Sequence, residues 1–426
     1  MGARKKTDEF ERRGYITQRL QLAAIGIESE FALVLDGEPV KPEDVFGDPR
    51  AFIREPMVHR TGTSYHLPTG GAIYFDTGVI ELATPVIELE RGCAARAGRS
   101  LWESIRFVRR ELDQWEQETG HNARLVGFST HYNISFELPR HQQRNGRTVQ
   151  KLALLLAYIL PLPVMLLATN RRSTGVGVRP RQDRIEVTVD FTPSAELMIA
   201  TGTLITGIVR SVMSWKSFEL TELVRHNIPL IEGYAPMRHT SRRGWLARFD
   251  CFPQNPFQAN IDEPIWRTTS NETLSLRTIG GRITRAFWHS IRRLSDPFTF
   301  RLIGSVIRGR APSLLDLADR PPEYEDVGRL CDWDDLFPPN QLQRSRYERI
   351  LIHAISGEKL RLFGQWFTPV GMRGWSQVVF RRDGEPARHY FSIDYLLSHL
   401  DAWEKTRTGR RTGSGKPRRL IARSKR

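Results

Sequence analysis

Residues 71–85 (GAIYFDTGVIELATP) bring a tyrosine and two acids into one short run of strand-forming residues. Tyr74 and Asp76 are two positions apart, and side chains two apart on an extended strand point to the same face. Thr77 and Gly78 predict a turn, after which Glu81 falls in the next strand. Taken alone, this run fits either a sheet face exposed to solvent, the commoner case, or a carboxylate site lined by a sheet.

Three further segments alternate in the same way, each with polar residues on one strand face. They are Glu28 and Glu30 in residues 25–31, His131 and Asn133 in 125–138, and Glu186 and Asp190 in 185–191. Neighbouring acids on one strand face repel each other unless a cation or an arginine neutralises them. Each segment could be an ordinary solvated face, but the fourfold repetition favours a shared site.

If the four segments lie in one antiparallel sheet with these faces aligned, they form an acidic floor. Carboxylate oxygens with one histidine suit a hard divalent cation, so Mg²⁺ or Mn²⁺ is the metal we expect. Residues 170–184 predict a basic, glycine-containing loop with Arg179, Arg181 and Arg184. Cations above a metal floor suit a nucleoside triphosphate, whose charge must be stabilised during phosphoryl transfer.

Length and composition limit the class of protein. With 426 residues the chain is longer than one compact core usually holds, which predicts two domains. The hydrophobic share of 40% and the charged share of 26% are typical of a soluble protein. The charged N-terminus has no apolar signal segment. Cys93, Cys251 and Cys331 are far apart and odd in number, which fits a reducing cytoplasm and no disulfide framework.

The longest apolar run, residues 152–168, contains Pro161 and Pro163 in its middle. The prolines argue against a simple membrane span, so we expect a buried helix that breaks there and packs on the sheet, and no membrane partner. The expected organisation is an N-terminal lead-in over 1–20, a catalytic domain over 21–315, a smaller α+β domain over 316–404 and a tail over 405–426.

The tail holds most of the excess positive charge. Ten Lys and Arg and no acid lie in residues 405–426, which leaves +5 of the formal net charge of +15 for the rest of the chain. With almost nothing to bury, the tail is expected to be disordered. It could bind nucleic acid or an acidic partner by charge, or serve solubility alone.

Several of these segments resemble a known family, in the family's order, over roughly residues 22–215. IGIESEF resembles the first strand of carboxylate–amine ligases of the glutamine-synthetase fold, and the Pup ligase/depupylase (PafA/Dop) family is the nearest branch. The other similar segments are GAIYFDTGVIELAT, STHYNISF, LLAYILPLPVMLLATN and RIEVTVDFTPSAELMIATGT. The resemblance implies an α+β protein with a glutamine-synthetase-like antiparallel sheet, backed by helices, that holds Mg²⁺ and ATP.

The resemblance also implies roles for single residues. Asp76 would be the catalytic base that deprotonates an attacking amine. Glu28, Tyr74 and Glu81 would be metal ligands, with Glu30 and His131 close by, and Thr84 would contact ATP. From the strand faces and the basic loop themselves, we also expect Glu30, His131 and Glu186 to hold metal, and Asn133, Arg179, Arg181 and Arg184 to contact ATP or substrate.

Three positions depart from the family pattern. Ala72 stands where the family has an ATP-contacting arginine, the turn before Glu81 is one residue shorter, and Glu186 replaces a metal-binding histidine. The resemblance implies ATP-dependent joining of a glutamate side-chain carboxylate, carried by a small acidic protein tag, to a substrate lysine amine. Two alternatives stay open: an amide hydrolase of the same fold, and a non-enzymatic protein that binds nucleic acid through its basic tail.

Overall fold

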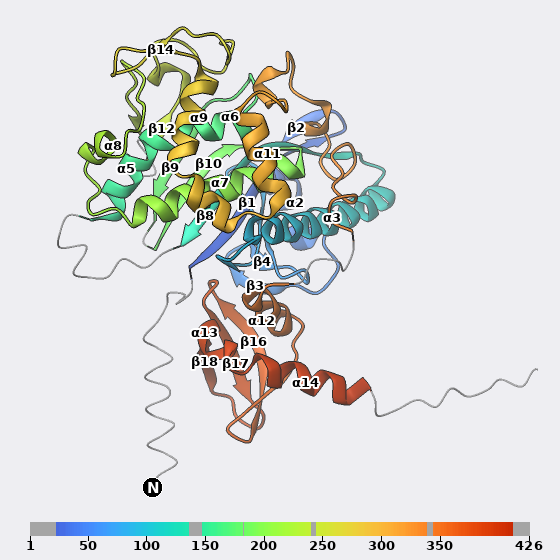
Figure 1. Ribbon diagram of the computed structural model, residues 1–426. Coiled ribbons are helices and arrows are strands. Elements are labelled where there is room, and N and C mark those ends of the chain that lie inside the picture. Colours follow the sequence, from blue (N-terminus) through green and yellow to red (C-terminus); the bar gives the residue numbers. More distant parts are fainter. Residues whose placement is uncertain (1–22, 136–146, 182, 240–243, 339–343, 412–426) are drawn as a thin grey trace, which may run out of the picture.

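The computed structural model of the protein describes residues 23–135, 147–181, 183–239, 244–338 and 344–411. These residues form two bodies: a large one built on an antiparallel sheet and a small one, drawn in orange to red below it in Figure 1. The arrangement confirms the predicted α+β class, with a large antiparallel sheet backed by helices.

The sheet of the large body has twelve strands in the described part of the chain, and its middle strand is β1 (Ala24–Leu35). β1 pairs antiparallel with β8 (Ala123–Ser135) on one side and β6 (Val79–Ala83) on the other. Because side chains alternate along a strand, Ile27 and Phe31 are fully buried in the core while Glu28 and Glu30 lie on the opposite face. The middle of the sheet therefore carries acids on one face.

The other strands extend the sheet on both sides of β1. On the β8 side follow β10 (Arg184–Asp190), β9 (Val176–Pro180), β12 (Trp245–Ala247) and β11 (Met237–Arg238). On the β6 side follow β5 (Ala72–Asp76), β4 (Ser64–His66) and β3 (Val58–Thr61), while β2 (Glu38–Val40) and β7 (Ile87–Glu88) also pair with β1. A separate pair is β13 (Trp266–Arg267) and β14 (Thr273–Leu274).

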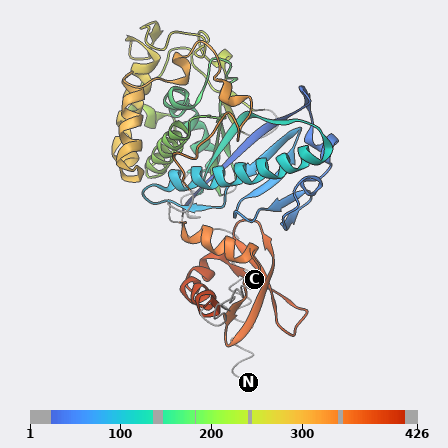
Figure 2. The ribbon, with the colours of Figure 1, turned by 90° about the vertical axis from the view of Figure 1, so that its right-hand side faces the viewer.

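Helices cover the apolar face of the sheet. Figure 2 shows the long α3 (Cys93–Thr119) lying across the strands, and α7 (Ala195–Met213) packs beside it against β8. The remaining helices of the large body are α2 (Pro42–Phe46), α5 (Val149–Ile159), α6 (Pro161–Ala168), α8 (Thr221–Arg225), α9 (Leu276–Ala286), α10 (Trp288–Leu294) and α11 (Pro297–Ile307). Short 3₁₀ turns are η1 (Pro49–Ala51), η2 (Phe249–Cys251), η3 (Leu314–Asp316) and η4 (Pro322–Tyr324).

The apolar run is a buried helix pair, as predicted. α5 and α6 meet at a bend of 60°, and every residue of α6 is buried. Pro161 is the first residue of α6. The N–H groups of the first turn have no acceptor within a helix, so the N–H that proline lacks costs no helical hydrogen bond at this position. By length and composition, α7 and the bent pair pass as candidate membrane spans among the described residues, but 78% of the α7 window is buried inside the protein, as is usual for a core helix.

The small body has a four-stranded sheet and its own core. Its elements are α12 (Arg346–Ile355), β15 (Leu360–Leu362), β16 (Gln365–Arg373), β17 (Gln377–Arg382), β18 (Arg388–Ser392), α13 (Ile393–Leu397) and α14 (Leu400–Arg411). The fully buried Phe380 and Trp403 pack in this core, with ring centroids 5.9 Å apart. An independent core is what a separately folding unit requires.

The two cores separate later in the chain than the predicted boundary at residue 316. Leu314 and Phe337 are still buried in the large core, whereas the small core begins at Tyr347. Of the predicted tail, residues 405–411 form the end of α14, and 412–426 lie outside the described residues, as does the lead-in over 1–20.

One local prediction was wrong: residues 170–184 are not a continuous loop. Val176–Pro180 is strand β9, paired with β10 and β12. Val176 and Val178 are buried at alternate positions, but Gly177 and the nearby proline hid this strand pattern in the sequence.

The two bodies meet through a buried ion pair and a ring contact. On α3, Arg99 Nη2 lies 2.6 and 2.7 Å from the two carboxylate oxygens of Glu348 on α12, and both side chains are buried. Beside β3 and β4, the His66 ring meets Trp375 of the small body edge-on, with centroids 4.9 Å apart. The position of the small body is therefore fixed by both charge and packing.

His66 predicts a pH dependence of stability. Burial and the nearby charge of Arg60 lower its pKa to about 3, so the folded protein holds the ring neutral. The unfolded chain binds a proton below about pH 6.5, so stability is lost as the pH falls from that value. We expect the free energy of unfolding to fall by about 2 kcal/mol between pH 7 and pH 5 through this residue. Urea unfolding of His66→Phe should show a flatter pH dependence; an unchanged slope would contradict the assignment.

Candidate functional site

The sheet register brings the predicted polar positions together. On β1, Glu28 stands beside His131 of β8, and Glu30 stands beside Glu81 of β6. β5 adds Tyr74, which is the partner of Glu81. The two-residue period therefore puts acids, a histidine and a phenol from four adjacent strands on one face.

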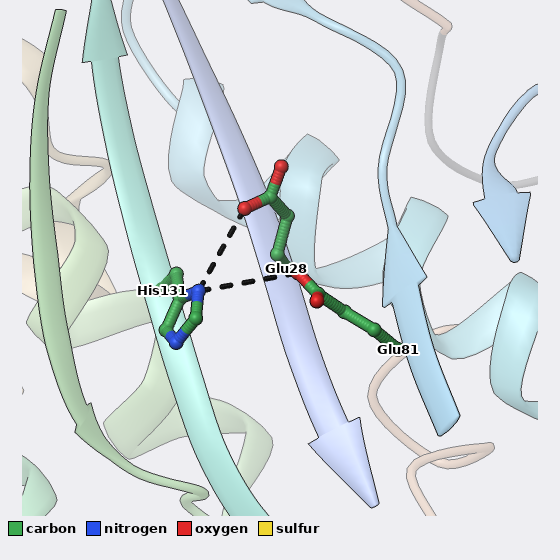
Figure 3. Close-up of side chains that lie close together, drawn as sticks. All are labelled: Glu28, Glu81 and His131. Atoms are coloured by element: carbon green, nitrogen blue, oxygen red, sulfur yellow. Dashed lines mark ion pairs between the residues drawn. The ribbon is translucent and has the colours of Figure 1, made fainter. Parts of the chain in front are cut away.

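Two overlapping groups of side chains are close enough to share a cation. In the first, His131 Nδ1 lies 3.7 Å from Glu28 Oε2 and 4.0 Å from Glu81 Oε1 (Figure 3). The second consists of Glu30, Asp76 and Glu81, whose ligand atoms lie within 4.8 Å of one another. Both groups share Glu81, which is nearly fully buried. Carboxylate oxygens, joined in the first group by the imidazole of His131, are suited to a divalent cation.

The pKa values in this cluster reflect its crowding. Burial and the negative charge of Glu28 raise the pKa of Glu81 to about 8. Burial alone would raise the pKa of Glu28 as well, but the hydrogen bond and charge of His131, with the charge of Arg184, lower it. Burial would lower the pKa of His131, yet Glu28 and Glu30 raise it. The raised pKa of Glu81 indicates that neighbouring carboxylates repel its negative charge, and a divalent cation would relieve this repulsion.

Hydrogen bonds from neighbouring strands hold the acids in place. Ser129 Oγ donates to Glu30 at 2.6 Å, and Asn133 Nδ2 donates to Glu28 at 3.1 Å. Arg184 Nε in turn donates to Asn133 Oδ1 at 2.8 Å. Asn133 thus orients Glu28, and such outer contacts position metal ligands in proteins.

Tyr74 supports Glu81 by hydrogen bonding. Its phenol donates to the Glu81 carboxylate, and burial together with the charges of Glu28 and Glu81 raises the pKa of Tyr74, so the phenol keeps its proton. Its role as a metal ligand stays a prediction.

Asp76 ends β5 at a tight, strained turn. Thr77 and Gly78 both have positive φ angles, 54° and 94°, as a two-residue hairpin turn of type I′ requires. A β-branched residue is disfavoured there, and such strain gathers at functional sites. Thr77 Oγ1 donates to Asp76 Oδ1 at 2.8 Å, and Gly78 N donates to Glu43 at 2.9 Å. The predicted turn is confirmed, and it orients Asp76.

Glu186 lies with arginines and outside the two groups that could share a cation. Arg179 Nε is 2.8 Å and Arg181 Nε is 2.7 Å from its carboxylate oxygens, and Glu186 is only 1% exposed. These ion pairs neutralise the carboxylate, so its metal-binding role stays a prediction. Arg179 Nη2 also donates to Thr188 at 2.7 Å and reaches to 3.4 Å from His131.

A first cavity of about 450 Å³ opens at the Glu28 end of the cluster, between the two bodies. The large body contributes Thr84, Asn133 and Arg184, and the small body contributes Trp375 and Arg373. The Thr84 hydroxyl accepts a hydrogen bond from the backbone N–H of Ile27 at 3.0 Å, which holds Thr84 in the lining of the cavity. Acids thus line the cavity at one end, and guanidinium groups and an indole also belong to its lining.

A second cavity of about 400 Å³ opens at the other end of the cluster. Glu30, Asp76 and His131 line it on one side, and Arg172 and Arg320 line it as well. His131, which contacts Glu28 of the first cavity, lies between the two spaces.

Residues that sequence reasoning missed complete both cavities. Arg60 of β3 lines the first cavity, and its guanidinium carbon lies 6.0 Å from the centre of the Tyr74 ring. A guanidinium is therefore present in this region although position 72 is alanine. Trp375 and Arg320 come from the half of the chain with no recognised motif, and only their contacts in the fold reveal them.

No protein-family model matches the chain, and no curated protein sequence matches it. Among solved structures, the chain is similar to the crystal structure of the complex between the prokaryotic ubiquitin-like protein Pup and its ligase PafA. The TM-score is 0.50 at 10% identity, over 95% of this chain and 98% of that chain. The chain has a PafA-like fold.

A second similar structure is the Pup ligase PafA of the prokaryotic ubiquitin-like modification pathway in complex with ADP, with a TM-score of 0.37, 10% identity and coverage of 81% and 91%. The match at 0.50 spans almost the whole chain, so the PafA-like fold includes both the large and the small body.

Proposed function

We propose that the protein is an ATP- and Mg²⁺-dependent carboxylate–amine ligase of the Pup-ligase type. The observation that carries the proposal is the acid and histidine cluster between two cavities, on a PafA-like fold. Glu28, Glu81 and His131, with Glu30 beside them, would hold Mg²⁺, which would balance the charge of the phosphates when bound.

The first cavity suits the nucleotide. Arg60 and Arg184 supply positive charge near Glu28 for phosphates, and the indole of Trp375 supplies an aromatic surface for a base. A space of about 450 Å³ is within the range of small-molecule sites.

The second cavity suits the carboxylate and the amine. The carboxylate oxygen attacks the γ-phosphorus of ATP, which forms an acyl phosphate and releases ADP. The amine then attacks the acyl carbon, the bond to phosphate breaks, and an amide and inorganic phosphate leave. Asp76, which lines this cavity, takes the proton that the amine loses. A glutamate-type carboxylate on a small protein tag and a lysine-type amine are the substrates we propose.

Nucleotide binding with and without Mg²⁺ tests this function. A ligand that binds only the folded state stabilises it, by about 2.7 kcal/mol at 100 times its Kd. We expect a thermal shift with ADP that requires Mg²⁺ in the wild type and is lost in Glu28→Gln. Glu38→Gln on the exposed strand β2 is the matched control and should keep the shift. No Mg²⁺-dependent shift in the wild type, or a full shift in Glu28→Gln, would contradict the proposal.

A further inference from the structure

The helices α9, α10 and α11 carry most of the positive charge of the large body. Their stretch, residues 276–310, is called the outer helical layer below, and it contains eight arginines, no lysine and one acid, Asp296. Its formal charge of +7 exceeds the +5 of the whole chain before the tail, so the other residues before the tail are acidic in sum. Charge gathered in this way indicates a site for a polyanion.

The outer helical layer lies on the side of the sheet away from the acid cluster. α10 and α11 pack on α7, and α7 packs against β8. There the Tyr132 hydroxyl donates to the backbone carbonyl of Met198 at 3.4 Å, whereas the neighbouring His131 belongs to the acid cluster on the other face. Figure 2 shows the yellow helices of the layer at the edge of the large body. The layer is therefore separated from the candidate active site.

Most arginines of the layer have no acidic partner. Arg277 and Arg282 are ion-paired with Asp262 and Glu272. The other six are exposed and form no ion pair within the described residues: Arg285, Arg292, Arg293, Arg301, Arg308 and Arg310. Guanidinium groups bind phosphate through two parallel hydrogen bonds, so arginine is the preferred residue for phosphate recognition.

Aromatic rings lie between these guanidinium groups. Trp288 and Phe300 are half-buried and pack with ring centroids 4.2 Å apart. The guanidinium carbon of Arg292 lies 6.0 Å from the centre of the Phe300 ring. Arg308 and Trp288 lie together over Gly304, which has no side chain to displace them. Arginines interleaved with aromatic rings are typical of surfaces that bind single-stranded nucleic acid.

A third cavity, of about 750 Å³, opens beside the layer. It is lined by Ala286 and Phe287, where α9 meets α10, and by Lys216. At its wall the His226 ring stacks on Trp215, with centroids 3.8 Å apart and ring planes 8° apart. Trp215 is buried whereas His226 is exposed, so the imidazole face away from Trp215 is suited to stack on one more planar ring.

Two further contacts bear on the charge of this region. Glu222, also in the cavity lining, accepts from Arg225 at 2.7 Å and lies 3.6 Å from His226, so its charge is balanced and it holds both side chains. Partial burial and the charge of Arg293 lower the pKa of Arg210, which also forms no ion pair within the described residues. A bound anion would relieve the repulsion between these two guanidinium groups.

We propose that the outer helical layer, together with the third cavity, binds single-stranded nucleic acid. The arginines contact successive phosphates, and one base enters the cavity and stacks on His226. An acidic polypeptide would supply the charge without the planar rings, and a duplex would have to break a base pair to place a base in the cavity. A lipid surface fits less well, because Phe298 is the only large apolar side chain that residues 276–310 expose. The inference does not depend on the ligase function.

Fluorescence anisotropy with the full chain at physiological ionic strength tests the inference. The labelled probes are oligo-dT and oligo-rU of about 20 nucleotides, longer than the roughly 4–16 that one single-strand-binding domain covers. A DNA duplex of the same length and poly-L-glutamate are the comparison ligands. We expect both single strands to bind more tightly than the duplex and poly-L-glutamate, and the ratio of their Kd values reports whether the sugar is recognised. Absent binding, or binding of either comparison ligand as tight as that of the single strands, contradicts the proposal.

Variants locate the strand. Arg285→Ala combined with Arg293→Ala should weaken single-strand binding at least about tenfold and reduce the slope of log K against log salt by about 1.4, the value for two lost phosphate contacts. Arg361→Ala combined with Arg388→Ala is the matched control, because it removes two exposed arginines of the small body. The control should bind as the wild type does, and the basic tail contributes equally to all of these proteins.

His226 reports on the cavity. His226→Ala should weaken binding about tenfold because one stacked base is lost, whereas His226→Phe keeps a planar ring and should retain the affinity. Unchanged binding by His226→Ala, or equal losses in the arginine pair and its control, would overturn the proposal, since charge alone would then hold the strand. Mg²⁺-ADP binding should be unchanged in every variant, so failure of this inference leaves the ligase proposal intact.

Discussion

Replacing Asp76 by asparagine is expected to slow amide formation with a lysine-type amine by about 10²–10⁴-fold, because general-base catalysis contributes that much to such reactions. Asparagine keeps the size of the side chain and can still accept the hydrogen bond from Thr77. The measurement is the rate at which the enzyme joins Nα-acetyl-lysine to a glutamate-type carboxylate in the presence of Mg²⁺ and ATP.

Hydroxylamine provides the matched control for Asp76→Asn. It is largely unprotonated at neutral pH and traps acyl phosphates as hydroxamates, so it needs no base. The variant should therefore lose much more activity with the lysine-type amine than with hydroxylamine. Equal losses with both amines, together with weaker Mg²⁺-dependent ADP binding, would show that Asp76 acts as a ligand with Glu30 and Glu81 instead, a role that their proximity also permits.

Replacing Glu348 by alanine is expected to destabilise the protein by about 3–5 kcal/mol. The Glu348 carboxylate accepts from Arg99 of the large body and caps its own helix at the backbone N–H of Ser345, 3.0 Å away. Without it, the Arg99 guanidinium stays buried with its strongest partner removed, and an uncompensated buried charge is costly.

Urea unfolding measures this effect. Lys359→Ala is the control, because the exposed pair of Lys359 and Asp383 should contribute under about 1 kcal/mol. Glu348→Ala should also weaken Mg²⁺-dependent ADP binding, since the small body supplies a wall of the first cavity. A free energy of unfolding of Glu348→Ala within about 1 kcal/mol of the wild-type value would show that the Arg99–Glu348 pair contributes little to stability.

The sequence predicted the acidic sheet face because strand periodicity is local. The alternation around Glu28, Asp76 and His131 is visible in each segment by itself, and a strand has only two faces. That these segments are neighbours in one sheet rested on a resemblance, and the register confirms it.

Pairings between strands were beyond sequence reasoning. The ion pairs of Glu186 with Arg179 and Arg181 depend on the β9–β10 hairpin, whereas the sequence predicts a loop before β10. Likewise Phe128, the extra residue of a β-bulge in β8, looked like an ordinary strand residue, because a bulge is a property of two strands and is not visible in one. Trp375 reaches its cavity only through the docking of the small body.

The first cavity is lined by two bodies that have separate hydrophobic cores. In the proposed function, this separates two tasks that many sites combine, the reaction itself and the recognition of the ligand. The groups that would take part in bond making all belong to the large sheet, whereas the indole of Trp375 belongs to a unit with its own folding core. If the first cavity holds the nucleotide as proposed, substitutions in the β16–β17 turn, which carries Trp375, would change the surface offered to the base and leave the acids of the large sheet unchanged.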